Sequence, residues 1–322
     1  MSEEEAVDAF VRLRWAETDG EPYCPYCGCA VVYRIDRNVK NRKTGQIVGK
    51  RRKFTCAECL KQFSPTSSTI FHGRKLGHRD ILFGIGLWVN GAKGEAALHL
   101  CRDMNVNVKT AFVLEKKLRE VMGALQHAEK LSGQVEGDAT YVGGYVKPAN
   151  LKKHRRDRRK TANQSGKRQA ITVLRQRNGK TRAFVKTEKE TADIMRDLVE
   201  IGTELIFDEA KAWDPLEALF PVRRVNHDGK DTKNYGEAAF SRDGISTNLA
   251  ESSHARLKRS EKGIHHHVSG PYLQGYADEM TWREDHRRIS NGEQFLTLVA
   301  AGLHHPPSRE WKGYWQRRKL AA

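Results

Sequence analysis

The sequence lacks any run of 18 or more apolar residues, which excludes a helix that spans a membrane. It begins Met-Ser-Glu-Glu-Glu, without the basic and then apolar start of a signal peptide, so we expect a cytoplasmic protein. Negative charge is scarce: 40 Asp and Glu face 57 Lys and Arg, leaving a net charge of +17. That imbalance favours a polyanionic partner, with nucleic acid the leading candidate, although a merely soluble basic protein has the same totals. A length of 322 residues suggests two domains, or one large domain with an appendage.

The positive charge is concentrated in one segment. Between Lys147 and Arg168, ten Lys and Arg accompany a single acid, Asp157, so this stretch holds about half of the net charge. It has no apolar periodicity and is predicted to be an exposed loop, which is either a solvated linker or a phosphate-binding segment. The second reading predicts DNA contacts for Lys152, Lys153, Arg155, Arg156, Arg158, Arg159 and Lys160.

Four of the six cysteines form two Cys-x2-Cys pairs with 28 residues between them: Cys24, Cys27, Cys56 and Cys59. Each pair can direct two thiolates to one tetrahedral Zn²⁺, and four soft ligands without an open position describe a structural site. The intervening aromatic and β-branched residues predict a metal-pinned hairpin, a zinc ribbon. A redox Cys-x-x-Cys is the alternative, and a second pair argues against it. Cys29 and Cys101 are predicted to lie outside the metal site.

The remaining patterns divide the chain into segments. Residues 94–122 show a short helix, a turn and a longer helix, which is typical of a helix-turn-helix but also of plain three-helix packing. If the segment is a helix-turn-helix, DNA contacts are expected from residues near the start of the longer helix: Asn107, Lys109 and Thr110. The predicted segments are an N-terminal helix at 1–20, the ribbon at 21–74, the helix-turn-helix region at 75–130, an α/β domain at 131–300 and a basic aromatic tail at 301–322.

Residues 131–300 read as an α/β domain with a mixed sheet. A strand at 133–138 is followed by strands at 169–175 and 181–186, joined by an Asn-Gly turn that is typical of a hairpin. A helix is predicted at 191–200, a buried strand at 203–208, and a further helix from Asp214.

Two of these predicted strands end in an acid. Asp138 closes the first strand and Asp208 closes the later buried strand. If the two strands are neighbours, both carboxylates face one edge of the sheet, where they attract Mg²⁺ or Mn²⁺. Two such ions can activate an attacking oxygen and stabilise the leaving oxygen of a phosphodiester. Each Asp taken alone could equally be a turn or capping residue.

A third acid belongs to the helical segment that starts near residue 247. Glu251 and Lys258 are two helical turns apart and share a face, with Asn248 one turn before Glu251. A metal-binding carboxylate followed by a lysine that holds a phosphate suits DNA cleavage. The alternative is structural, because Asn248 at the N-cap and Glu251 three residues later also form a capping box.

These motifs together resemble the prokaryotic insertion-sequence DDE transposases with an N-terminal zinc ribbon, the ISXO2-like relatives of the eukaryotic Merlin elements. The similarity covers roughly residues 22–300. It is carried by Val135–Gly144 and Leu205–Asp208, by Val225-Asn226-His227, by Thr247–Glu251 with Leu257-Lys258-Arg259, by Gly263–Ser269 and by Tyr276–Arg283.

The resemblance implies a ribonuclease-H-like fold and Mg²⁺-dependent DNA strand cleavage and strand transfer. Asp138, Asp208 and Glu251 then hold the metal, and Asn248 competes with Glu251 as third catalytic residue. Lys258 and Arg259 then contact DNA, the partners are terminal repeats and target DNA, and a homodimer or larger nucleoid-associated assembly is expected. Ala139, where relatives often carry an acid, and Gly137 depart from the pattern. A stand-alone nuclease and a zinc-ribbon regulator with an inactive catalytic domain remain alternatives.

Overall fold

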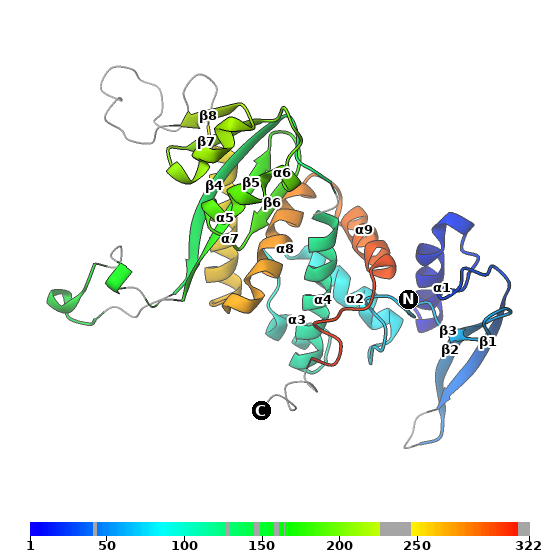
Figure 1. Cartoon of the computed structure of the whole chain (residues 1–322). Coiled ribbons are helices and arrows are strands. Elements are labelled where there is room, and N and C mark those ends of the chain that lie inside the picture. The colour runs from blue at the N-terminus through cyan, green and yellow to red at the C-terminus, as the bar shows by residue number, and fades with distance from the viewer. Residues whose placement is uncertain are drawn as a thin grey trace. The chain divides into compact units, whose positions relative to one another are not determined.

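The computed structural model describes residues 1–40, 44–126, 129–144, 149–157, 161–163, 165, 167–225 and 246–314 (Figure 1). The chain forms two compact units: unit 1 comprises residues 1–121 and 289–322, and unit 2 comprises residues 122–288. Residues 289–300, which the predicted segment 131–300 includes, therefore group with unit 1. In the part of the chain that the structure describes, no helix is long and apolar enough to cross a membrane.

Unit 1 begins with helix α1 (Glu3–Arg14), whose first turn is closed by a capping box between Ser2 and Glu5. A short 3₁₀ turn, η1 (Ala16–Thr18), follows. Strands β1 (Val32–Lys40), β2 (Ile47–Cys56) and β3 (Gln62–Phe63) then form an antiparallel sheet in that order. Trp15 packs edge-on against Phe54 and Phe63, so α1 and the hairpin share one small core.

The rest of unit 1 is helical. Helices α2 (His78–Asn90), α3 (Ala97–Asp103) and α4 (Val108–Gln126) follow one another, and α9 (Asn291–His304) packs against α1 and α2. The short turn between α3 and α4 matches the predicted succession of helices. Gly91 ends α2, as its break in the apolar pattern indicates.

Unit 2 is built on a five-stranded mixed sheet in the order β6-β5-β4-β7-β8. Its strands are β4 (Gln134–Gly143), β5 (Arg168–Gln176), β6 (Thr181–Phe184), β7 (Glu204–Asp208) and β8 (Val222–Val225). Strands β4, β5 and β6 are antiparallel, whereas β4, β7 and β8 are parallel. The predicted mixed α/β class is confirmed, and β4 and β7 are neighbours as the proposed site requires.

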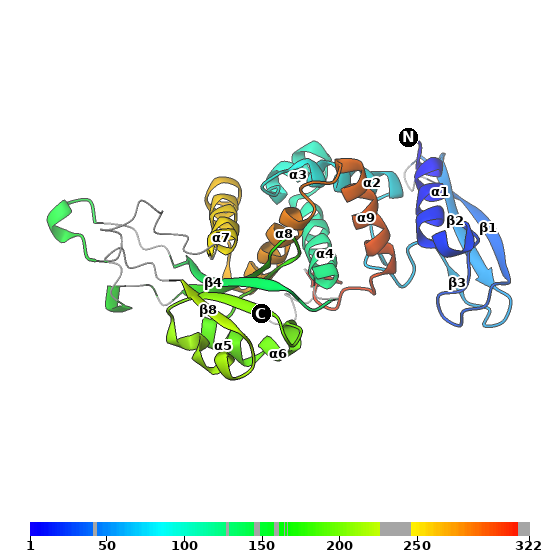
Figure 2. The same ribbon diagram turned by 90° about the horizontal axis from the view of Figure 1, so that it is seen from above.

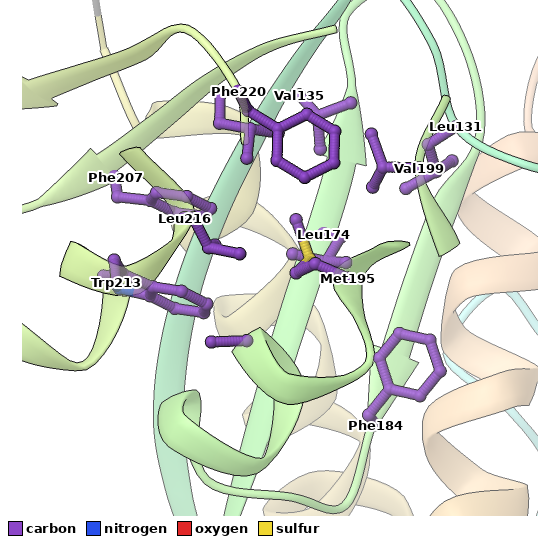
Figure 3. Close-up of a cluster of buried hydrophobic side chains, with 12 residues drawn as sticks. Leu131, Val135, Leu174, Phe184, Met195, Val199, Phe207, Trp213, Leu216 and Phe220 are labelled. Atoms are coloured by element: carbon purple, nitrogen blue, oxygen red, sulfur yellow. The ribbon is translucent and has the colours of Figure 1, made fainter. Parts of the chain in front are cut away.

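Helices cover both faces of this sheet (Figure 2). One face carries α5 (Glu188–Asp193), α6 (Met195–Leu198) and the 3₁₀ helix η4 (Lys211–Ala218), which bury the core drawn in Figure 3. The other face carries α7 (Asn248–Ser260) and α8 (Leu273–Asp285), with a π-helical turn η6 (Glu261–His265) and a 3₁₀ turn η7 (Gly270–Tyr272) between them. Two further 3₁₀ turns, η2 (Lys152–His154) and η3 (Thr161–Asn163), lie between β4 and β5.

Three local predictions were wrong. Strand β4 continues five residues beyond Asp138, because Thr140 and Val142 pack against the sheet's neighbours and extend the pairing with β5 to Gly143. The helix expected at 191–200 is broken at Ile194 into α5 and α6. Asp214 caps no helix, since its carboxylate lies 2.7 Å from Arg224 of β8, a strand that the sequence patterns missed.

Candidate functional site

The first two predicted metal ligands lie on adjacent parallel strands. The pairing of β4 with β7 ends with Glu136 opposite Ile206, and Asp138 and Asp208 each come two residues further along their strands. Because side chains alternate across a strand, these even-numbered positions of β4 point to the face that carries α7 and α8. Both aspartates are half-buried, so their carboxylates border the protein interior and solvent.

Each aspartate is oriented by backbone donors beside it. Asp138 Oδ1 accepts a hydrogen bond from the N–H of Ala139 at 2.8 Å, and Asp208 Oδ1 accepts one from the N–H of Ala210 at 3.1 Å. Asp138 Oδ2 lies 3.2 Å from Nδ1 of His254, a buried side chain on α7. The first aspartate and α7 are therefore in direct contact. Sequence reasoning missed His254, although it lies one turn beyond Glu251.

A further carboxylate lies close to the two aspartates. Burial raises the pKa of Glu188, and the negative charges of Asp208 and then Asp138 raise it further. Glu188 is the first residue of α5, and Thr187 and Glu190 form the capping box of that helix. The capping box already explains the sequence pattern around Glu188. No signal in the sequence therefore separates Glu188 from an ordinary helix start.

Helix α7 is fastened to β4 by a buried carboxylate. Glu136 is fully buried, and its Oε2 accepts a hydrogen bond from the N–H of Leu249, in the first turn of α7, at 2.9 Å. Its Oε1 accepts from Nε of Arg177 at 3.0 Å. A carboxylate at a helix N-terminus satisfies an orphan N–H and complements the helix dipole. Glu136 therefore fixes where α7 begins over the two aspartates.

This arrangement also decides the capping of α7. Thr247 occupies the N-cap and its side chain makes no capping bond, while Asn248 is the first helical residue and is exposed. Thr247 Oγ1 instead lies 3.4 Å from Oε1 of the half-buried Glu251. The capping-box alternative for Asn248 and Glu251 was therefore wrong. Lys258 is half-buried two turns further on, and Arg259 is exposed.

The carboxylates are of the chemical type that Mg²⁺ prefers, and Glu251 lies on α7, the helix that contacts Asp138 through His254. They are not drawn together as tightly as the cysteines: over the described residues, Asp138, Asp208 and Glu251 do not form a set of ligand atoms within 4.8 Å. The donor set fits a hard divalent cation.

The four predicted zinc ligands do form such a set. The Sγ atoms of Cys24, Cys27, Cys56 and Cys59 all lie within 4.8 Å of one another. Two pairs, Cys24 with Cys59 and Cys27 with Cys56, are 3.6 and 3.5 Å apart. Zn–S bonds of about 2.3 Å place the sulfurs of a tetrahedral site about 3.8 Å apart, so the cluster fits a structural Zn²⁺.

Local groups favour the thiolate form at Cys56, whereas burial and neighbouring thiols raise the pKa of Cys27 and of Cys59. Burial disfavours the ionised form of Cys56, but N–H groups of Cys59 and Glu58, together with neighbouring thiols, lower its pKa to about 6. Cys29 contacts the carbonyl of Val31 and the thiol of Cys56, and Cys101 contacts the carbonyl of Leu98, but neither belongs to the four-cysteine set.

Apart from Arg259 on α7, the predicted DNA-binding residues fall on two surfaces. Asn107 and Lys109 are exposed and Thr110 is half-buried at the start of α4, where Asn107 Oδ1 accepts from the N–H of Lys109. The basic segment is exposed at its described positions, Lys152, Lys153, Arg155 and Arg156. Arg158, Arg159 and Lys160 lie outside the described residues, as do Asn226 and His227 of the family motif.

Comparison with known proteins supports the same assignment for the zinc ribbon and for the domain that contains the five-stranded sheet. A family model described as a transposase zinc-ribbon domain matches residues 1–62. A second model, described as an ISXO2-like transposase domain, matches residues 130–285, which contain Asp138, Asp208 and Glu251. No curated protein and no solved structure matches the chain. The chain therefore belongs to the insertion-sequence DDE transposases that carry an N-terminal zinc ribbon.

Proposed function

We propose that the chain cleaves DNA strands at the ends of its insertion sequence and transfers them to target DNA. The observation that carries the proposal is the placement of Asp138 and Asp208 on adjacent parallel strands, with α7 held against Asp138 through His254. Such a sheet, with helices on both faces, is what a ribonuclease-H-like fold requires. The matching transposase model over these residues supports the same reaction class.

Within this site each residue has a distinct task. Asp138, Asp208 and Glu251 hold the metal through carboxylate oxygens, and Lys258, two turns after Glu251, positions the flanking phosphate. A pair of Mg²⁺ or Mn²⁺ ions held there would activate the attacking oxygen and stabilise the departing one. Glu136 keeps α7 in place, and His254 orients the Asp138 carboxylate.

DNA binding is assigned to the other features of the chain. The zinc ribbon and the α3–α4 pair, acting as a helix-turn-helix, recognise the terminal repeats, and pairing of two ends calls for a dimer or larger assembly. The exposed basic segment that includes Lys152 and Arg156 holds DNA beside a carboxylate site that would otherwise repel it. Each phosphate neutralised on duplex DNA contributes about −0.9 to the slope of log K against log salt. Replacing Lys152, Lys153, Arg155 and Arg156 by Ala should flatten that slope with little change in sequence preference.

The test is cleavage of DNA that carries the flanking sequence of the gene. We expect strand cleavage that requires Mg²⁺ or Mn²⁺ and is lost in Asp138→Asn, because the amide removes a ligand charge. Asp197→Asn, at an exposed acid of unit 2, is the matched control and should leave cleavage intact. Undiminished cleavage by Asp138→Asn would refute the site.

Two further comparisons separate the alternatives. Glu251→Ala should abolish cleavage while Asn248→Ala, at an exposed position, should not; the reverse result would make Asn248 the third ligand. Cleavage without joining of the cut ends to a second DNA identifies a stand-alone nuclease. Specific DNA binding with no cleavage by any form identifies a regulator.

A further inference from the structure

Unit 1 contains a cavity that the proposed chemistry does not use. It is a partly open pocket of about 550 Å³, bordered mainly by three stretches of chain: 71–76, 107–117 at the start of α4, and 311–314. We call it the tail cavity, and its lining includes Phe71, Asn107, Thr110, Lys117, Trp311 and Tyr314. Its volume lies within the roughly 300–1,000 Å³ of sites that enclose a small ligand.

The lining of the tail cavity is positively charged. Arg74, Lys75, Lys109, Lys117 and Lys312 border it, and the described residues of the lining include neither Asp nor Glu. Burial lowers the pKa of His72, and the charges of Lys312 and Lys117 lower it further. Burial likewise lowers the pKa of Lys117, the charge of Glu120 opposes that shift, and the charge of Lys312 adds to it. These cations are close enough to repel one another, and an anion in the cavity would relieve that repulsion.

One wall of the cavity is aromatic and firmly held. Trp311 is buried, and its ring centre is 6.2 Å from that of Phe112 and 5.1 Å from that of Tyr314. The ammonium of Lys116 lies 5.9 Å from the centre of the Trp311 ring, a cation–π distance. The half-buried Tyr314 faces the same cavity. An aromatic wall beside cations is the combination that binds single-stranded nucleic acid, through base stacking and phosphate contacts.

We propose that the tail cavity binds one unpaired nucleotide of the DNA, with its base on Tyr314 and its phosphate near Lys75 and Lys312. A duplex keeps its base faces stacked and offers only base edges in its grooves, so stacking of a base on an aromatic wall requires an unpaired nucleotide. Asn107 and Thr110 line the same cavity, which places it where α4 is expected to meet DNA. The inference rests on the proposed function only in taking DNA as the substrate.

The test compares two fluorescent probes by anisotropy: a blunt duplex, and the same duplex with a short unpaired 3′ extension that contains 2-aminopurine. The full chain should bind the extended probe about tenfold more tightly, as expected for one stacked base, and should quench the 2-aminopurine. Tyr314→Ala should lose both effects, whereas Phe83→Ala, at an exposed aromatic outside the cavity, should keep them. The double variant Lys75→Ala with Lys312→Ala should bind the extended probe with a shallower slope of log K against log salt. The slope should change by about 0.7 for each single-strand phosphate that is no longer neutralised.

Equal affinity for the two probes, or an extension effect that survives Tyr314→Ala, would overturn the proposal. Thymidine monophosphate that binds as tightly as the extended probe would also overturn it, because the cavity would then serve a free nucleotide. Blunt-duplex binding and Mg²⁺-dependent cleavage, measured on the same preparations, report on the proposed function separately. Loss of cleavage in Asp138→Asn should leave the preference for the extended probe unchanged.

Discussion

The buried carboxylate of Glu136 offers a sharp test of how the site is assembled. It accepts from the N–H of Leu249 at 2.9 Å and from Nε of Arg177 at 3.0 Å, so both oxygens are acceptors. Glu136→Gln keeps the shape but turns one oxygen into an NH₂ group. The amide can then accept from only one partner, and it directs a donor at the other. Arg177 loses its counter-charge in either orientation of the neutral amide, and in one of them the first turn of α7 also loses its acceptor.

The magnitude follows from these two hydrogen bonds. A hydrogen bond to a charged group contributes about 1.5–3 kcal/mol, and removal of one partner of a buried ion pair costs about 3–5 kcal/mol. The side chain of Arg177 is 26% exposed, so water offsets part of the second loss. We expect the free energy of unfolding to fall by about 2–4 kcal/mol. For a unit of the size of residues 122–288, that lowers Tm by roughly 4–16 °C.

Two measurements check the prediction. One is thermal unfolding, and the other is Mg²⁺-dependent cleavage at a temperature below the Tm of both the parent chain and Glu136→Gln. Cleavage should fall further than the folded fraction does, because α7 carries Glu251 and His254 against Asp138. The matched control is Glu129→Gln, which removes the exposed ion pair with Lys180 and should cost at most about 1 kcal/mol. If Glu136→Gln changes Tm and cleavage no more than Glu129→Gln, the anchoring role of Glu136 is refuted.

Three other perturbations address separate parts of the molecule. Gly137→Ala places a Cβ 2.2 Å from Cε1 of Phe207, beside Asp208, so urea unfolding should show a loss of about 1–3 kcal/mol, while Gly86→Ala, with open space, should show none. Burial raises the pKa of Asp278 to about 7. As the pH rises, this carboxyl ionises in the unfolded chain before it ionises in the folded one. The free energy of unfolding therefore falls as the pH rises from about 4 to about 7. The stability of Asp278→Asn relative to the parent chain should therefore increase as the pH rises through that range. If urea unfolding shows the same difference between the two proteins at every pH, the reasoning is wrong. Cys56→Ser should release bound zinc and open the ribbon to proteolysis, whereas Cys29→Ser should retain the metal.

The structure explains one of the two departures from the family pattern, Gly137, by close packing, and the other, Ala139, contributes only its backbone. Gly137 is explained by its neighbour, since the Phe207 ring, stacked on Trp213 with centres 4.1 Å apart, fills the space that a Cβ would need. Close packing behind the strand therefore demands glycine beside Asp138. Ala139 contributes its N–H to Asp138, a bond that any residue except proline supplies. The contact that the structure describes for residue 139 does not require an acidic side chain.

The sequence by itself determined the features that depend on short spacings. Two Cys-x2-Cys pairs predict the cysteine cluster because each pair needs only a local turn, and the Asn178-Gly179 turn predicts the β5–β6 hairpin because Asn178 takes the left-handed conformation that such turns need. The assignment of Asp138, Asp208 and Glu251 as catalytic ligands is a prediction of the same kind, based on strand patterns and family motifs.

Only the tertiary structure decided what surrounds those acids. Glu136 and Leu249 are 113 positions apart, and Arg175 meets Glu284 across 109 positions, so no local pattern reveals either pairing. The place of Asp138 within β4, the nearness of Glu188 and the tail cavity arise in the same way. Each depends on which segments the buried cores bring together, and side chains distant in the chain acquire a common environment only when the apolar faces of the sheet and helices are packed.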